Sequence, residues 1–217
     1  EEIQPFLKKN IEGINIIENK TNFRFQPIQE VQAQAAGKKT VIFTGYACDN
    51  ICRFCIDLNK RDINRSTQEV LKDIAIAKKK GTEILEIIGW EVTIRKDFFI
   101  IMKFIKNLNF NHVYLVTNGN KMSDYEFSKK FYDLDVIDSI VFSIHGSTPE
   151  IHNRVTNTPK SFEKLLEWIS NWKKLWFDAR KIGTNTAIEQ GNYQDLPEIA
   201  KLIQKLWCLW SSEFIFA

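Results

Sequence analysis

The sequence predicts an α/β fold built on a parallel sheet, and two observations support this prediction. From residue 40 onward, short β-rich apolar runs alternate with longer segments whose apolar residues recur at helical spacing. Strands and helices that alternate in this way favour a parallel sheet with right-handed crossovers. An open doubly wound sheet and a barrel both satisfy the pattern, so spacing alone leaves the two architectures open.

The expected elements follow in chain order, after an N-terminal segment of a different character. Residues 1–39 hold two short alternating apolar patches with a turn-prone stretch between them, which predicts a small arm or hairpin ahead of the main domain. The main domain is expected to span residues 40–217. Its expected strands are 40–44, 83–88, 112–117, 139–144, 181–188 and 213–216, and its expected helices are 66–80, 96–108, 123–132, 161–175 and 193–206.

The first of these helices carries the clearest boundary signals. Ser66 or Thr67 can cap its start, Glu69 lies in the first turn and Gly81 follows its end. Later boundaries rest on the change from alternating to helical periodicity.

Composition limits the classes of function. A hydrophobic content of 44% with 26% charged residues is typical of one globular core. The net charge of +3 is small and spread along the chain, so nucleic acid is not indicated. Apolar runs fall short of the roughly 20 residues of a membrane span, and no export signal or membrane partner is expected. Clustered cysteines do not form a disulfide framework, so we expect a reducing, cytoplasmic location.

The most informative stretch is the loop after the first strand, which carries Cys48, Cys52 and Cys55. Three of the four cysteines thus fall within one short loop, as a metal centre requires when several thiolates must converge. The spacing C-x3-C-x2-C lacks the second ligand pair of the usual zinc pattern. It indicates an iron–sulfur cluster with one iron free of a protein ligand. Cys208, among tryptophans, is expected to be buried and inert.

With Phe54 directly before Cys55, the loop resembles the C-x3-C-x-aromatic-C signature of the radical S-adenosylmethionine (radical SAM) enzymes. The resemblance covers residues 40–216 and implies a partial (β/α)6 TIM-like barrel with parallel strands, open on one side. It implies a [4Fe-4S] cluster on the three cysteines and S-adenosylmethionine on the open iron, with Phe54 beside the adenine. Such enzymes reductively cleave S-adenosylmethionine to a 5′-deoxyadenosyl radical, which abstracts hydrogen from the substrate. The implied partners are a small-molecule or peptide substrate and an electron donor such as flavodoxin or ferredoxin.

The segment after the second strand resembles a cofactor-binding segment of the same family. Gly89, Trp90 and Glu91 occupy the place of its Gly-Gly-Glu-Pro-Thr motif, whose backbone and acidic side chain receive the amino group of S-adenosylmethionine. An ammonium group needs acceptors, and Glu91 supplies a charged one. Trp90 for Gly and Val92 for Pro depart from the motif. An indole here is expected to crowd the cofactor, or to change the backbone path if the glycine needs φ > 0.

Later strand ends supply the remaining candidates. By the same resemblance, Ser143 faces the ribose or carboxylate region of the cofactor and Asn185 hydrogen-bonds the ribose hydroxyls. Asn118 lies in a Thr-Asn-Gly turn, which either lines the cavity or is simply good turn chemistry. His145 at the mouth of a barrel is a candidate proton donor, further ligand or structural residue, and His152 is expected to be structural.

Two hypotheses from other classes stay open. The chain is alternatively a non-catalytic α/β binding protein, in which Trp90 and Val92 have abolished cofactor binding. It is also a candidate zinc protein, with His145 or Asp49 as fourth ligand.

Overall fold

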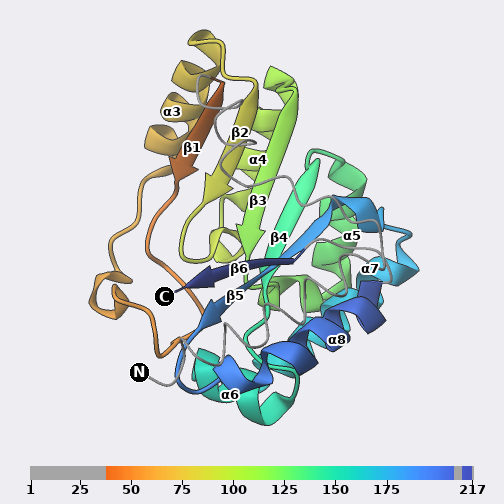
Figure 1. Ribbon diagram of the computed structural model, residues 1–217. Coiled ribbons are helices and arrows are strands. Elements are labelled where there is room, and N and C mark those ends of the chain that lie inside the picture. Colours follow the sequence, from red (N-terminus) through yellow and green to blue (C-terminus); the bar gives the residue numbers. More distant parts are fainter. Residues whose placement is uncertain (1–37, 208–211, 217) are drawn as a thin grey trace.

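A single parallel sheet organises the fold. The computed structural model describes residues 38–207 and 212–216. Residues 1–37 of the predicted arm, and Cys208, lie outside the described residues. Within the described ranges, six strands pair in parallel in the order β1-β2-β3-β4-β5-β6 (Figure 1). The strands are β1 Lys39–Phe43, β2 Ile84–Ile88, β3 His112–Thr117, β4 Ser139–Ser143, β5 Ile182–Ile188 and β6 Ser212–Phe216.

Helices connect successive strands and pack around the outside of the curved sheet (Figure 1). The α-helices are α3 Thr67–Lys79, α4 Phe98–Leu108, α5 Tyr125–Leu134, α6 Pro149–Thr156, α7 Ser161–Lys174 and α8 Leu196–Trp207. Short 3-10 helices are η1 Leu58–Lys60, η2 Val92–Ile94, η3 Asn120–Ser123, η4 Ala179–Lys181 and η5 Tyr193–Asp195. The described part of the chain has no helix both long and apolar enough to cross a membrane.

The strand order decides between the two architectures that the sequence left open. A doubly wound sheet reverses its strand order at a switch point, whereas each strand here lies beside its sequence neighbours. The described strands show no pairing between β1 and β6, so the barrel is open on that side. The predicted partial (β/α)6 barrel is therefore confirmed.

Local sequence explains where α3 begins, as predicted. The Glu69 backbone N–H donates to Ser66 Oγ at 3.3 Å, and the Ser66 N–H donates to the Glu69 carboxylate at 2.8 Å. This reciprocal capping box satisfies two helix-terminal donors. Gly81 follows the helix with φ of 79°, a conformation that favours glycine.

The expected strands and helices are all present, with ends displaced by at most a few residues, but α6 was not predicted. The sequence-based helices skip from residue 132 to residue 161. In the structure, Thr148 caps α6, its hydroxyl accepting from the Ile151 N–H at 3.4 Å, and Pro149 occupies the first turn. Two of the expected helices also start later than predicted, because their first residues form η3 and η5.

The main hydrophobic core lies between the sheet and the helices. Alternate residues of the strands are fully buried there, as the period of two along a strand requires. From the sheet these include Leu85, Ile87, Leu115, Ile140 and Phe142, and from the helices Ile74, Ile101, Ile105, Trp168 and Trp172. The intervening strand positions face the other side of the sheet.

Leu115, in the middle of β3, tests the contribution of this core to stability. Its side chain is 0% exposed, so Leu115→Ala should lower the free energy of unfolding by about 2–5 kcal/mol. Urea unfolding followed by circular dichroism measures the loss. Ile100→Ala is the control, since Ile100 on α4 is 58% exposed and should change stability little. Equal losses for the two variants would contradict this description of the core.

Candidate active site

The cysteine loop, residues 44–65, leaves the carboxyl end of β1 and returns to α3. Its base is closed by an isolated antiparallel bridge between Gly45 and Asn64, and by the Tyr46 N–H, which donates to the Ile63 carbonyl at 3.1 Å. Gly45 has φ of 142°, and a Cβ there would lie 2.4 Å from Asn64 Oδ1. Only glycine therefore allows the two ends of the loop to approach this closely.

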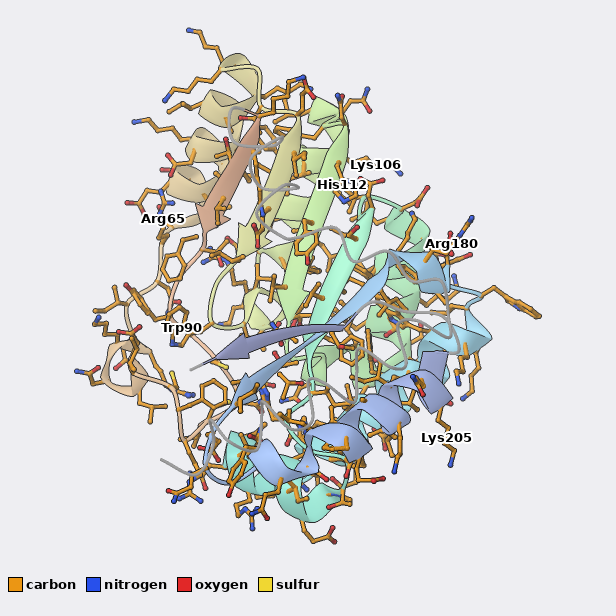
Figure 2. All side chains as sticks on the ribbon, in the orientation of Figure 1. Arg65, Trp90, Lys106, His112, Arg180 and Lys205 are labelled. Atoms are coloured by element: carbon orange, nitrogen blue, oxygen red, sulfur yellow. The ribbon has the colours of Figure 1, made fainter. Side chains whose placement is uncertain are left out.

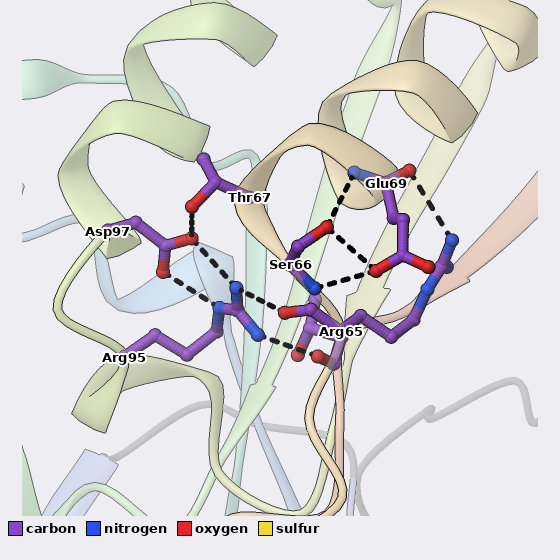
Figure 3. A network of polar contacts seen from close by, with 7 residues as sticks. Arg65, Ser66, Thr67, Glu69, Arg95 and Asp97 are labelled. Atoms are coloured by element: carbon purple, nitrogen blue, oxygen red, sulfur yellow. Dashed lines mark hydrogen bonds and ion pairs between the residues drawn. The ribbon is translucent and has the colours of Figure 1, made fainter.

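Arg95 joins both ends of the cysteine loop to the segment after β2 (Figure 3). Its guanidinium donates to the Thr44 carbonyl at 2.7 Å and to the Arg65 carbonyl at 3.0 Å. A bidentate ion pair with Asp97, at 2.9 and 2.7 Å, fixes the guanidinium plane. Desolvation acts to raise the pKa of Asp97, but the hydrogen bonds from Arg95 and Thr67 outweigh it and hold that pKa below its usual value.

The outer part of the loop is anchored to the end of α6. The Ile51 N–H donates to the Thr156 carbonyl at 3.1 Å, and the Arg53 N–H donates to the Val155 carbonyl at 2.9 Å. Carbonyls in the last turn of a helix lack partners within the helix, so the loop satisfies them. The helix that sequence analysis missed thus positions the cysteines.

A cavity of about 310 Å³ lies at the carboxyl ends of the strands, and all three clustered cysteines line it. The other lining residues include Phe54, Arg61, Gly89, Trp90, Val116, Thr117, Asn118, Ser143 and His145. The structure therefore brings the predicted cluster ligands together with most of the predicted cofactor-binding residues. Glu91 and Asn185 are the two that do not line this cavity.

Glu91 is buried, and its carboxylate is engaged within the protein. It accepts from the Thr93 N–H at 3.0 Å, the Thr117 hydroxyl at 2.7 Å and the Asn118 N–H at 2.6 Å, and also from the Thr93 hydroxyl. Burial raises the pKa of Glu91, and these hydrogen bonds oppose the rise. The Glu91 side chain thus ties the loop after β2 to the end of β3, while its contact with the amino group of the cofactor stays a prediction.

The backbone around Glu91 continues from β2 along the base of the cysteine loop. The Trp90 N–H donates to the Gly45 carbonyl at 3.1 Å, and the Glu91 N–H donates to the Ala47 carbonyl at 2.9 Å. A Cβ on Gly89 would lie 2.5 Å from Thr44 Oγ1, so glycine is required there. Trp90 is not among the described residues with positive φ, so the indole needs no strained backbone.

Ser143 and Asn185 are neighbours across β4 and β5, where they form a register pair. Ser143 lines the cavity. Asn185 Oδ1 is buried and has no hydrogen-bond partner among the described residues. A buried acceptor without a partner is costly, and a ligand hydroxyl would satisfy it. This orphaned atom is compatible with the predicted role of Asn185 at a ribose.

His145 and His152 are buried and held by backbone donors. The Ala187 N–H donates to His145 Nδ1 at 3.2 Å, and the His145 N–H donates to His152 Nδ1 at 3.1 Å. Desolvation lowers the pKa of His145 to about 3 and that of His152 to about 4. Both rings are therefore neutral with the proton on Nε2. His145 contacts Phe54 edge-on at 5.0 Å between ring centres, which makes it a support for that ring.

The donor set fits an iron–sulfur cluster better than a zinc ion. Among the described residues, no three His, Cys, Asp or Glu side chains are grouped to hold one metal ion. The cysteines of a cubane cluster each bind a different iron, so their sulfurs need not converge on one point. Asp49, a proposed zinc ligand, instead accepts from Asn118 Nδ2 at 2.7 Å. Burial raises the pKa of Cys48 to about 12 and that of Cys52 to about 11, so thiolates here require a cationic centre.

Fold and site together define a partial α/β barrel protein with a thiol-lined cavity at the carboxyl edge of its sheet. Residues 37–203 match the family model described as Radical SAM superfamily, and the chain belongs to this superfamily of enzymes. The cofactors of the family are a [4Fe-4S] cluster and S-adenosylmethionine, as predicted from the cysteine loop.

Individual relatives are distant. The chain is 24% identical over 163 residues to a probable GTP 3′,8-cyclase of Saccharolobus islandicus (strain M.14.25 / Kamchatka #1), and 27% identical over 163 residues to that of Saccharolobus solfataricus. Each match covers 74% of this chain and 51% of the relative, so the chain spans about half the length of these curated relatives. Streptococcus suis SuiB bound to S-adenosylmethionine has the same fold, with a TM-score of 0.65 at 14% identity, over 98% of this chain and 52% of SuiB.

The ion pair between Arg95 and Asp97 should make stability depend on pH. Because the pKa of Asp97 is lowered in the fold, its carboxylate stabilises the protein above the unfolded-chain pKa of about 3.9. This contribution is lost as the pH falls through the folded-state pKa. Arg95→Met should lower the free energy of unfolding by about 1–3 kcal/mol at neutral pH, with the ion-pair part reduced by solvent screening. The difference from wild type should shrink as the pH falls below that unfolded-chain value.

Urea unfolding at a series of pH values measures this difference. Arg180→Met is the matched control, because Arg180 pairs with Asp178 on the surface and its side chain is 84% exposed. It should change stability little at any pH. A pH-independent effect of Arg95→Met would contradict the role of the ion pair.

Glu91→Gln tests the structural role of the buried carboxylate. The amide nitrogen of glutamine cannot accept, so at least one of the donors that now contact Glu91 loses its partner. We expect the free energy of unfolding to fall by about 1–3 kcal/mol, measured with urea. Glu86→Gln is the control, since the Glu86 carboxylate on β2 pairs with one group among the described residues, the Lys39 ammonium at 2.6 Å. A smaller loss for Glu91→Gln than for Glu86→Gln would argue against this role.

Proposed function

We propose that this chain is the catalytic core of an enzyme that takes a hydrogen atom from its substrate with a radical made from S-adenosylmethionine. One observation carries the proposal. The thiols of Cys48, Cys52 and Cys55 line a single cavity together with Phe54 and Ser143. Ser143 ends β4, far along the chain from the cysteine loop, and the parallel sheet brings the two to one edge.

Each of these residues, and Asn185 as the strand neighbour of Ser143, has a proposed task. The three cysteines hold the cluster, which when bound supplies the electron that cleaves S-adenosylmethionine to methionine and a 5′-deoxyadenosyl radical. Phe54 packs against the adenine. Ser143 and Asn185 hydrogen-bond the ribose side.

The amino group of S-adenosylmethionine is proposed to meet the segment that follows β2. The carbonyls of Gly89 and Trp90 can accept from an ammonium, and the Glu91 carboxylate adds negative charge behind them. Because the Glu91 carboxylate already accepts four hydrogen bonds from within the protein, its proposed task is to hold this backbone in place. Apolar lining from Phe54 and Val116 would keep water from a radical.

The proposed substrate is a small molecule or a peptide. The curated relatives are named for a reaction of GTP, and one structure of SuiB is described as bound to a precursor peptide. The proposed source of the electron is a protein such as flavodoxin or ferredoxin, in a reducing cytoplasm that leaves the thiols free.

Anaerobic reconstitution with iron and sulfide tests the proposal. The wild-type chain should turn brown with about four irons bound, and with dithionite it should convert S-adenosylmethionine to 5′-deoxyadenosine, measured by chromatography. Cys48→Ala, Cys52→Ala and Cys55→Ala should each lose colour and product. Cys208→Ala is the matched control and should keep both.

Two results would reject this proposal. A wild-type chain that binds S-adenosylmethionine without forming 5′-deoxyadenosine would favour the non-catalytic binding protein. Bound zinc without labile sulfide would favour the zinc protein.

A further inference from the structure

The side chain of Trp90 contacts one of the proposed cluster ligands. Its indole N–H donates to Cys55 Sγ, with 3.1 Å between Nε1 and the sulfur. Two other donors reach a clustered cysteine in the described structure, the Asn50 N–H at 3.4 Å and Asn118 Nδ2 at 3.8 Å, and both contact Cys48. The Trp90 contact is thus the shortest of the three, and it reaches a different ligand.

Neighbouring groups fix the direction of the indole. The Trp90 backbone N–H is bonded to the Gly45 carbonyl, and the ring packs edge-on against Phe43 at 5.7 Å and Tyr46 at 5.1 Å between ring centres. Figure 2 shows Trp90 beside the cysteine loop, at the opposite end of the sheet from His112. Phe43 and Tyr46 also contact each other, at 4.8 Å between ring centres, so one cluster of three rings holds the indole with its N–H toward the sulfur. A phenyl ring would keep much of this packing but could not donate.

We propose that Trp90 is a positioning residue that raises the reduction potential of the cluster through its hydrogen bond to the Cys55 thiolate. The inference rests on the proposed function, since Cys55 is a thiolate ligand only when the cluster is bound. One electron from an external donor converts [4Fe-4S]2+ to [4Fe-4S]+, and no proton is transferred. The reduced cluster carries one more negative charge, part of it on its sulfurs, so an N–H donor stabilises it more than the oxidised cluster.

Trp90→Phe removes the donor and should shift the midpoint potential of the [4Fe-4S]2+/+ couple to a lower value. Anaerobic redox titration followed by electron paramagnetic resonance measures the potential of the reconstituted protein. Trp176→Phe is the matched control, because Trp176 is 88% exposed and lies in the loop before β5, at the amino end of the strands. The cluster of this variant should have the same midpoint potential as that of wild type. Equal potentials for Trp90→Phe and wild type, with clusters bound in both, would overturn this inference alone. A wild-type chain that takes up no cluster would reject the proposed function instead.

A second measurement covers the case in which Trp90→Phe binds no cluster. Wild-type protein labelled with 15N at the indole of tryptophan should show, after reduction, a 15N hyperfine coupling to the cluster by electron–nuclear double resonance. Spin density on the Cys55 sulfur reaches the indole nitrogen through the hydrogen bond. Absence of this coupling would overturn the inference without any substitution.

Discussion

The site depends on closure of the cysteine loop at its base. Apart from η1, residues 44–65 form no helix or extended strand, and holding their ends together costs conformational entropy that other contacts must offset. The bridge between Gly45 and Asn64 and the two carbonyl contacts of Arg95 supply those contacts. Because Arg95 donates to the main-chain carbonyls of Thr44 and Arg65, it holds the backbone at the two ends of the loop together. The three thiols can then share a cavity although each lies on irregular backbone.

The parallel sheet supplies the other half of the geometry. Carboxyl ends of neighbouring strands meet at one edge, which places the segments after β1, β2, β3 and β4 around the same space. Glu91 then joins the second of these segments to the third through buried hydrogen bonds. The end of α6 holds the outer part of the cysteine loop. Contacts between segments distant in sequence therefore hold both the cysteine loop and the segment after β2 in place.

Sequence reasoning succeeded where the signal was local. Such signals, each contained within a few residues, are the capping box at Ser66, the periodicity of the strands and the spacing of the cysteines. The capping box and the strands are confirmed, and the three cysteines line one cavity. It missed α6 because eight residues give too short a period to detect, although Thr148 and Pro149 are a recognisable helix start. The state of His145 was out of reach, because its partner is the backbone of Ala187, 42 residues further along the chain.

In the segment after β2, two neighbouring side chains make independent contacts. Glu91 has extended backbone angles, φ −154° and ψ 103°, and follows the bend at residues 89–90. The Glu91 carboxylate accepts from Thr117 inside the protein, while the Trp90 indole reaches Cys55. Gly89, just before these two residues, allows the backbone to pass close to the Thr44 side chain. Because these tasks belong to separate side chains, tryptophan in place of the glycine of the family motif leaves the ties of Glu91 undisturbed, and its effect falls on the sulfur that it contacts.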